Sequence, residues 1–485
     1  MDEALLKEKG IRFTLEAEPF ISKHNITAEE ILSLDKLFIS TDDLELLLKM
    51  RSEAGADSAP PKTETKTEVS LPTGFTPIAK EHDAQIIIRD ATDVTGKSRT
   101  EGKTDDFVAY FRNRYERLAA ILRSYGGKYP EADLHGISKL AGQRVRSIVM
   151  VSDIRETKKG NILLEVEDLS DQFKIVISQR DEEVFQKARN LVKDDVVLVY
   201  GKVAQAFIIA EDFEWPDVPV AREKEKPEND LAGVYLSDLH FGSKQFLGQY
   251  FNRFSDWING RGENPELAGK VKYVFVAGDI VDGIGIYPNQ EKDLDVVDIF
   301  KQYEMFTDFV EELPDYIEVI VSPGNHDAVR RADPMPALSK DILGCDVVSV
   351  GSPCTLSVEG LEHLIYHGTS SDGWIATLPH LSCDHPEKVM IECLKRRHLS
   401  PIFGSHAIVP EKLDYMMIER VPDVVHFGHV HKNGYANHRG SLIINSGTFQ
   451  DTTDFQQRQG HIPTPAKVPI LEFRSNKLRT LDFTR

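Results

Sequence analysis

Cysteine is scarce in this sequence. Its 485 residues include 4 cysteines, and all of them fall in one short region without a Cys-x-x-Cys pair: Cys345, Cys354, Cys383 and Cys393. This spacing argues against both a disulfide framework and a zinc ribbon, so we expect reduced core thiols. A small zinc site that uses the nearby His380, His385 or His398 is the alternative.

Long apolar runs are absent as well. No stretch approaches the roughly 18 apolar residues of a membrane span, and the charged residues within Met1–Arg12 exclude a signal-peptide pattern there. With 41% hydrophobic residues the chain can build real cores, and its length predicts two or three domains. We therefore expect a globular cytoplasmic protein without a membrane partner.

Positive charge is in deficit. The chain has 58 Lys and Arg against 78 Asp and Glu, which gives a formal net charge of -20. Such a chain as a whole repels nucleic acid. If the substrate is DNA, the cationic contacts that phosphates require must come from bound divalent metal, from a local basic patch or from a partner subunit.

The N-terminal part of the sequence divides into three segments. Apolar residues at helical spacing predict a small helical module over 1–50. Residues 51–75 are rich in Ala, Pro, Lys, Thr and Glu, which predicts a disordered linker. Residues 76–140 form a connecting segment, with a short strand over 84–89 and an amphipathic helix over 105–125.

Residues 141–220 change to the pattern of a β domain. Runs rich in Val and Ile predict five strands, at 144–151, 161–167, 173–177, 195–202 and 207–211. A helix over 182–191 interrupts them between the third strand and the fourth. This order suggests an oligonucleotide/oligosaccharide-binding (OB) barrel, although the pattern alone fits a generic small β domain equally well.

From residue 231 to 485, buried strands alternate with helices, which predicts a layered α/β domain. Apolar residues that include Val297 and Phe300 predict helices over 246–258 and 297–313 that cover a sheet. Five apolar strands run into polar residues: Asp238 and His240 after 234–236, Asp279 after 273–277, Asn325 after 317–321, His367 after 364–366, and His429 and His431 after 424–427.

These strand ends predict one shared site. In an open α/β sheet, side chains at the carboxyl ends of neighbouring strands converge on one crevice. Seven carboxylate, imidazole and amide ligands exceed the needs of one ion, so we expect two divalent metal ions. The mixed ligand set suits manganese first, with iron or zinc as alternatives, whereas magnesium prefers oxygen ligands. This chemistry is that of a two-metal phosphodiesterase.

The order Asp-x-His, Gly-Asp-x-x-Asp, Gly-Asn-His-Asp, His and Gly-His-x-His resembles the calcineurin-like metallophosphoesterase superfamily from about residue 231 onward. The resemblance implies one metal held by Asp238, His240, Asp279 and His431, and a second held by Asp279, Asn325, His367 and His429. It also implies a catalytic His326 that protonates the leaving oxygen, oriented by the carboxylate of Asp282 or Asp327.

The residues that flank these motifs resemble more closely the small subunit of archaeal family D DNA polymerase. They include 237–243, 323–327, 366–368, 409–412, 447–450 and 463–469. The order of a variable N-terminal region, an OB barrel and a phosphodiesterase domain agrees with that family. The resemblance implies a 3′–5′ exonuclease that proofreads single-stranded 3′ ends and primer-template DNA near the nucleoid, paired with a large catalytic polymerase subunit.

Two other functions remain open at this point: a hydrolase of small phosphoesters that uses the same metals, and a non-catalytic scaffold subunit of the polymerase. The intact ligand motifs favour catalysis over the scaffold, and the expected barrel favours a nucleic-acid substrate. The pairs Arg330 and Arg331, and Arg396 and Arg397, are candidate phosphate contacts. For the second pair, ordinary solvated surface is the more natural interpretation.

Overall fold

The computed structural model describes residues 74–485 except 223 and 459, together with Pro72, Arg12–Phe13, Ile21 and Phe38–Ile39. The chain forms two compact units, Met1–Thr67 and Glu68–Arg485. In the first unit, β1 (Arg12–Phe13) pairs in parallel with β2 (Phe38–Ile39). The rest of the helical module predicted for 1–50, and nearly all of the linker predicted for 51–75, lie outside the described residues.

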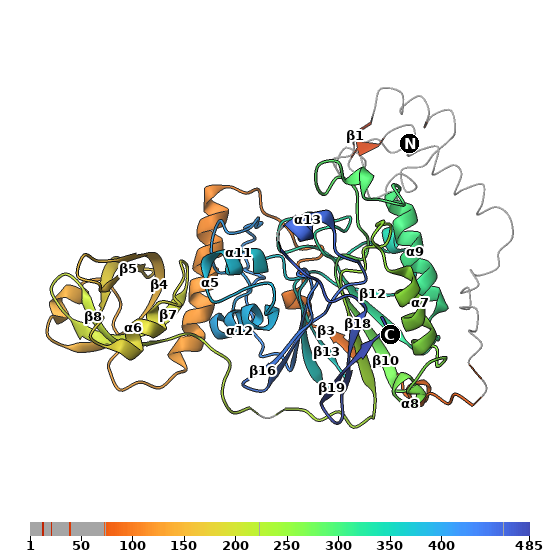
Figure 1. The fold of residues 1–485 in the computed structure, drawn as a ribbon. Coiled ribbons are helices and arrows are strands. Elements are labelled where there is room, and N and C mark those ends of the chain that lie inside the picture. The colour runs from red at the N-terminus through yellow and green to blue at the C-terminus, as the bar shows by residue number, and fades with distance from the viewer. Residues whose placement is uncertain are drawn as a thin grey trace. The chain divides into compact units, whose positions relative to one another are not determined.

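The predicted OB barrel is confirmed. Its strands close in the order β4-β5-β6-β8-β7 (Figure 1). The elements are β4 (Arg144–Glu156), β5 (Ile162–Glu167), β6 (Gln172–Ile177), α6 (Glu182–Ala188), β7 (Val196–Val203) and β8 (Ile208–Glu214). Strand β4 runs five residues beyond its predicted end because its first half pairs with β7 and its second half with β5, so it turns a corner of the barrel.

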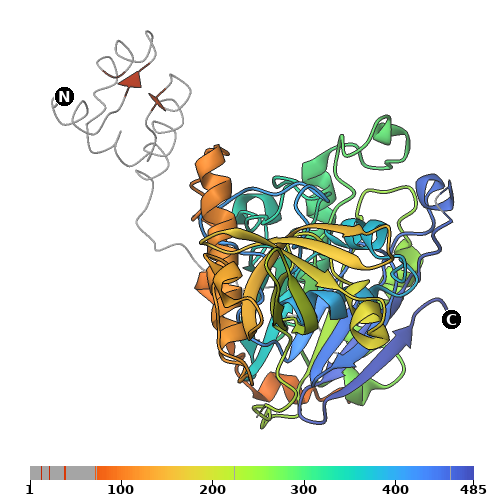
Figure 2. The same cartoon turned by 90° about the vertical axis from the view of Figure 1, so that its left-hand side faces the viewer.

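A long helix packs against the outside of this barrel. Helix α5 (Thr104–Arg123) buries Leu118 and Leu122 against Ile148 and Leu198 of the barrel wall. In Figure 2 the helix runs along one side of the barrel strands. From the same helix, the buried Arg114 donates to the carboxylate of Asp414 over 2.8 Å. Helix α5 therefore joins the barrel to the C-terminal domain.

The C-terminal domain contains two six-stranded sheets, in the orders β12-β11-β10-β9-β18-β19 and β16-β17-β15-β14-β13-β3. The first has β9 (Ala232–Leu236), β10 (Val271–Ala277), β11 (Glu318–Ser322), β12 (Val348–Ser349), β18 (Lys467–Glu472) and β19 (Lys477–Asp482). The second has β3 (Ile86–Ile88), β13 (Cys354–Val358), β14 (Leu361–Ile365), β15 (Val424–Phe427), β16 (Gly434–His438) and β17 (Ser441–Asn445).

The single open sheet expected from the sequence is thus wrong in one respect, because the strands are shared between two sheets. Strands β9 to β12 are parallel to one another, and so are β14, β15 and β17. An apolar strand that ends in a ligand looks the same in either arrangement. Strand β3, from the predicted connecting segment, pairs with β13 and so belongs to the second sheet.

Helices cover the outer faces of both sheets (Figure 1). Helices α7 (Gly248–Ile258) and α9 (Ile299–Glu312) pack on the first sheet, whereas α11 (Ser371–Thr377) and α12 (Pro386–Arg396) pack on the second. Both helices predicted for the first sheet are present, but Val297 and Phe300 are 53% and 65% exposed rather than packed on it. Asp298 caps α9, which leaves Val297 before the helix and Phe300 in its first turn.

Within residues 74–485 the remaining helices are short. They are α8 (Pro265–Ala268), α10 (Lys340–Leu343), α13 (Asp454–Arg458) and the 3-10 turns η1 (Ile78–Glu81), η2 (Asp90–Thr92), η3 (Ile137–Leu140) and η4 (Gln290–Lys292). None of the helices in the described residues is both long enough and apolar enough to cross a membrane.

Candidate metal centre

The seven ligand positions predicted from the sequence lie just beyond strand ends of both sheets. Asp238, Asp279 and Asn325 follow β9, β10 and β11 of the first sheet. His367, His429 and His431 follow β14 and β15 of the second. The two parallel sets of strands therefore present their carboxyl ends to the same region.

Five of the seven positions have left-handed backbone conformations. The φ angles are 52° for Asp238, 52° for His240, 51° for Asp279, 69° for His429 and 51° for His431. Such angles are strained for residues other than glycine and persist only where surrounding structure imposes them. Here the strand-end turns hold one another, since the backbone N–H of Asp238 donates to the Gly278 carbonyl over 2.9 Å. Strain of this kind is typical of functional sites.

One group of donors gathers around Asp238. Its Oδ1 lies 3.4 Å from Nε2 of His431, and that nitrogen lies 3.0 Å from Nε2 of His240. All three side chains are buried. Two ring nitrogens and a carboxylate oxygen that face one another in this way offer three ligands to a single cation.

A second group gathers around Asp279. Its Oδ2 lies 3.3 Å from Nε2 of His367 and 3.8 Å from Nε2 of His240, so this carboxylate stands between the two groups. Asn325 joins the second group, with Oδ1 3.1 Å from Nε2 of His367. His429 lies at the edge, and its Nε2 donates to Asp372 over 3.2 Å. The shared carboxylate is what a two-metal arrangement requires.

Hydrogen bonds fix the orientation of two of the histidine rings. Nδ1 of His240 donates to Oδ1 of Asp282 over 3.0 Å, and Nδ1 of His367 donates to the Ala277 carbonyl over 2.8 Å. Each bond places the proton on Nδ1 and leaves Nε2 unprotonated in the neutral ring, facing the carboxylates. This is the usual way in which a protein presents histidine to a metal.

The electrostatics of the cluster call for a cation. Burial alone would lower the pKa of His367, but the carboxylates of Asp279 and Asp238 raise it to about 10. Burial opposes the charge of Asp279, yet its pKa stays well below the usual range because His367 and His326 surround it. Divalent cations would supply the same compensation while leaving the imidazoles neutral, so the donor set fits a metal centre.

His326 borders the second group, although its partner differs from the one expected. Its Nδ1 donates to the backbone carbonyl of Asp282 over 2.7 Å, and its Nε2 lies 4.0 Å from Oδ2 of Asp279. The carboxylate of Asp282 instead holds His240. A backbone carbonyl therefore orients His326, whereas the family resemblance implied a carboxylate.

Asp327 also has a different role from the one expected. Its carboxylate accepts hydrogen bonds from the backbone of Gly324 over 2.8 Å and of Ile280 over 3.2 Å, and from the Tyr303 hydroxyl over 3.2 Å. Burial, together with the nearby charge of Asp279, raises the pKa of Asp327 to about 7. It ties the loop after β11 to the loop after β10 and makes no hydrogen bond to the ring of His326 in the part of the chain described.

Comparison with known proteins agrees with this geometry. The calcineurin-like phosphoesterase family model matches residues 234–433. The DNA polymerase II small subunit of Methanocaldococcus jannaschii is 39% identical over 84% of this chain and 70% of its own length. That of Archaeoglobus fulgidus is 42% identical over 79% of this chain and 78% of its own, and that of Methanothermobacter thermautotrophicus is 38% identical over 81% and 82%. The chain belongs to the DNA polymerase II small subunit family. The metallophosphoesterase fold implies divalent metal ions.

Several residues that support the predicted ligands were not predicted from the sequence. Asp372 holds His429, Gln290 and Gln450 donate to the Asp282 carboxylate, and Gln456 lies 2.8 Å from Nδ1 of His431. Gln450 lies in one of the flanking motifs, and this position was the only sequence feature that pointed to it. The others lie in the separate elements α11, η4 and α13, and only the fold brings these elements to the site.

The four arginines predicted as phosphate contacts differ in exposure and in their partners. Arg396 and Arg397 are 2% and 4% exposed, so solvated surface is wrong for both. Arg396 pairs with Asp195 at the edge of the barrel and with Glu392, whereas Arg397 donates to backbone carbonyls. Arg330 pairs with Glu411. Arg331 remains exposed, and it donates to the carbonyls of Gly285 and Ile286.

The cysteine region holds no metal cluster in the described part of the chain, because none of the three groups of metal-ligand type contains a cysteine. Cys354 and Cys393 are buried thiols, as expected, whereas Cys345 and Cys383 are only partly buried. His398, one of the residues considered for zinc, is hydrogen-bonded to Asp414 over 2.8 Å.

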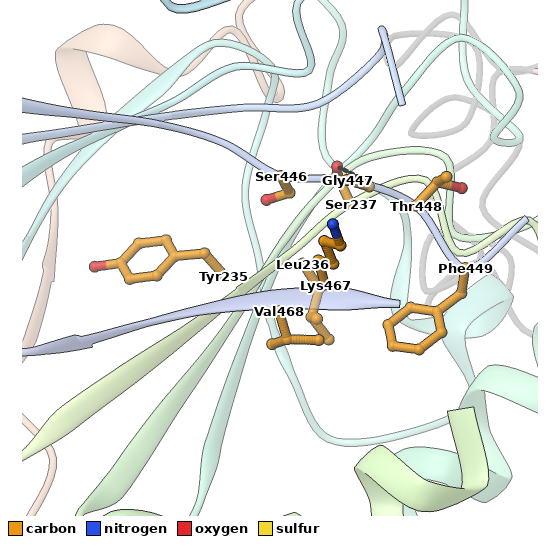
Figure 3. Close-up of a pocket in the computed structure, with 9 residues that line it drawn as sticks. All are labelled: Tyr235, Leu236, Ser237, Ser446, Gly447, Thr448, Phe449, Lys467 and Val468. Atoms are coloured by element: carbon orange, nitrogen blue, oxygen red, sulfur yellow. Dashed lines mark hydrogen bonds between the residues drawn. The ribbon is translucent and has the colours of Figure 1, made fainter. Parts of the chain in front are cut away.

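A small pocket lies at the end of strand β9 (Figure 3). Its lining comes from the ends of β9 and β17 and the start of β18: Tyr235, Leu236, Ser237, Ser446, Gly447, Thr448, Phe449, Lys467 and Val468. It includes none of the seven predicted ligands. Its volume of about 10 Å³ leaves room for roughly one water molecule, so it is too small for a nucleotide.

Proposed function

We propose that this chain is a metal-dependent 3′–5′ exonuclease that proofreads as the small subunit of a heteromeric archaeal replicative DNA polymerase. One observation carries the proposal: the ligand positions converge around a shared Asp279 in a chain of the DNA polymerase II small subunit family. A scaffold would not need to keep strained, buried ligands together. The partners in this proposal are DNA and a large catalytic subunit, in the region of the nucleoid.

In this proposal two sets of residues hold two divalent cations, with manganese as the first candidate and iron, zinc or magnesium as alternatives. The sets are Asp238, His240, Asp279 and His431, and Asp279, Asn325, His367 and His429. When bound, the two cations neutralise phosphate charge and lower the pKa of the attacking water.

The protein's own contribution to proton transfer is His326. Its Nδ1 is occupied by the Asp282 carbonyl, so Nε2 faces the centre and can protonate the leaving 3′ oxygen as the phosphorus–oxygen bond breaks. Burial lowers the pKa of His326, and a phosphate bound beside the ring would favour its protonated form. Water adds to phosphorus directly, since none of the ligand motifs places a serine or cysteine as nucleophile.

The test compares two substrates and two variants in the presence of manganese, with and without the large subunit. End-labelled single-stranded DNA reports nuclease activity, and a small chromogenic phosphodiester reports the bare chemistry. We expect His326→Ala to lose DNA hydrolysis, while His135→Ala, an exposed histidine in the loop before the barrel strands, retains it.

The alternatives give different results. Hydrolysis of the small phosphodiester without hydrolysis of DNA would make the chain a general phosphoesterase. If the wild-type chain degrades neither substrate even with its large subunit, the scaffold function is correct. Shortening of a 5′-labelled strand from its far end establishes the polarity.

A further inference from the structure

A loop beside His326 presents apolar side chains to solvent. Ile284 is 44% exposed and Tyr287 is 38% exposed. The loop follows Asp282 directly, whose carbonyl holds the ring of His326. The two loops also touch at Gly283, where an added Cβ would lie 2.3 Å from the His326 carbonyl oxygen. Residues 283–287 therefore form one edge of the metal centre.

Hydrogen bonds hold this loop in place. Gln290 donates to the Asp282 carbonyl over 2.8 Å and accepts from the Ile286 backbone over 2.9 Å. Gln302 accepts from the Gly283 backbone over 2.9 Å, and the Tyr287 hydroxyl donates to Asp293 over 3.0 Å. A loop tied down at so many points keeps Ile284 and Tyr287 exposed, although exposed apolar surface is unfavourable in water.

Arg331 adds a positive charge to the same edge. Its Nη2 donates to the Gly285 carbonyl over 2.7 Å and its Nη1 to the Ile286 carbonyl over 3.1 Å. These bonds fix the guanidinium beside the exposed side chains and leave other N–H donors free. Within the described residues no carboxylate lies within ion-pairing distance of Arg331, in contrast to Arg330 and Arg396. Its charge is therefore available to a ligand.

We infer that Ile284, Tyr287 and Arg331 form a binding edge for the last nucleotides of a single strand of nucleic acid. This inference rests on the proposed nuclease function and names how the substrate is held. The guanidinium contacts a backbone phosphate, and a base packs on the ring of Tyr287 and the side chain of Ile284. Stacking of this kind tolerates any base, as an exonuclease requires. It also requires an unpaired end, because a base inside a duplex has no free face.

The experiment uses the full chain, alone and with its large subunit, and compares Tyr287→Ala and Arg331→Ala with the wild type. Affinity for a single-stranded oligonucleotide is measured by fluorescence anisotropy in a chelator at several salt concentrations. We expect each variant to bind roughly tenfold more weakly. For Arg331→Ala, the slope of log affinity against log salt should shrink by about 0.7, the value for one lost phosphate contact to a single strand.

Three controls separate the contributions. Tyr287→Phe keeps the ring and loses only the bond to Asp293, so it should bind like the wild type. Arg331→Lys should keep most of the salt dependence. Arg261→Ala removes an exposed arginine that is paired with Asp256 at the end of α7, and it should change nothing.

Kinetics with manganese decide whether the edge acts on substrate or only supports His326. The inference expects a higher KM for single-stranded DNA and, for the small chromogenic phosphodiester, turnover within twofold of the wild type. Equal losses on both substrates would overturn it, as would unchanged oligonucleotide affinity. Weaker binding of the large subunit with unchanged DNA affinity would make this edge a protein-docking surface instead. A wild-type chain that hydrolyses neither substrate would remove the proposed nuclease, and the anisotropy result would still decide the binding edge.

Discussion

The barrel and the phosphoesterase domain use buried positions differently. The barrel interior consists of apolar side chains that alternate along each strand, such as Leu164, Val166 and Ile175. At the strand ends of the phosphoesterase domain, the carboxylates of Asp238 and Asp279 and the imidazoles of His240, His367 and His431 are equally buried, and five of the predicted ligands have positive φ. In the barrel, the buried side chains are the apolar ones that packing favours. At the strand ends, packing buries polar side chains and holds their backbone in conformations that these residues do not prefer. Such conflict is expected where a protein keeps residues for chemistry rather than for stability.

The largest expected effect is on catalysis and comes from the strand ends. Asp279→Asn removes the negative charge that both donor groups share. Loss of several kcal/mol of electrostatic stabilisation predicts a fall in kcat on the order of a thousandfold or more. The chain should remain folded in a thermal melt and should lose affinity for manganese in a titration by calorimetry.

The matched control for that variant is Asp171→Asn, which alters an exposed carboxylate of the barrel and should leave both measurements unchanged. Wild-type manganese affinity in Asp279→Asn would show that this carboxylate is not a ligand, and the contrast between the two regions would fail.

The next effect is on stability and comes from the barrel. Ile175→Ala empties a fully buried position inside the closed sheet. Truncation of a buried Ile to Ala costs about 2–5 kcal/mol of unfolding free energy. Urea unfolding should show this loss for the barrel, while turnover of the small phosphodiester by the folded variant stays at the wild-type level. A large loss of that turnover in the folded variant would show that the barrel takes part in the chemistry.

Much of this contrast between the barrel and the strand ends could be predicted from the sequence, because it depends on local sequence patterns. Runs rich in Val and Ile predicted the five barrel strands, and polar residues after apolar runs predicted the seven ligand positions. The two-sheet arrangement could not be predicted, since strand β3 pairs with β13 about 270 residues later in the chain. The burial of Arg396 depends on Asp195, 201 residues away. The separate roles of Asp282 and Asp327 depend on which loops the fold brings together.

The core between the two sheets should give the protein a pH-dependent stability. Burial lowers the pKa of His363 to about 4, below the unfolded value of about 6.5. The neutral ring is fully bonded, since its Nδ1 donates to the Leu361 carbonyl and its Nε2 accepts from the Tyr235 hydroxyl. As pH falls below about 6.5, the unfolded chain binds the proton first, so stability is complete above this pH and falls toward pH 4.

Unfolding in urea at pH 7 and pH 5 measures this effect. One such histidine contributes a difference of about 2 kcal/mol between the two conditions. His363→Gln keeps a donor and an acceptor, so its pH 7 to pH 5 difference should be smaller than that of the wild type by this amount. An identical difference in the two proteins would show that His363 is not the group that titrates.

The smallest of these effects comes from Asp282, which acts through the predicted ligand His240. It sharpens the comparison between the two regions because the backbone of Asp282 is not strained. Asp282 accepts from Nδ1 of His240 over 3.0 Å, and its φ is not among the positive values. Asp282→Asn keeps the shape of the side chain, but its amide cannot accept from His240, Gln290 and Gln450 at once. Loss of such a partner typically costs 10–100-fold in metal affinity or activity.

A positioning role for Asp282 has a signature that a catalytic role lacks. If Asp282 fixes His240 for the metal, the manganese concentration for half-maximal activity should rise, and excess manganese should restore most of kcat. His326→Ala, which removes the proposed proton donor and leaves every ligand in place, should gain nothing from added manganese. If manganese rescues neither variant, the Asp282 carboxylate acts on the chemistry itself rather than by positioning His240 for the metal. A residue without backbone strain would then take part in the chemistry and not only support the strained ligands.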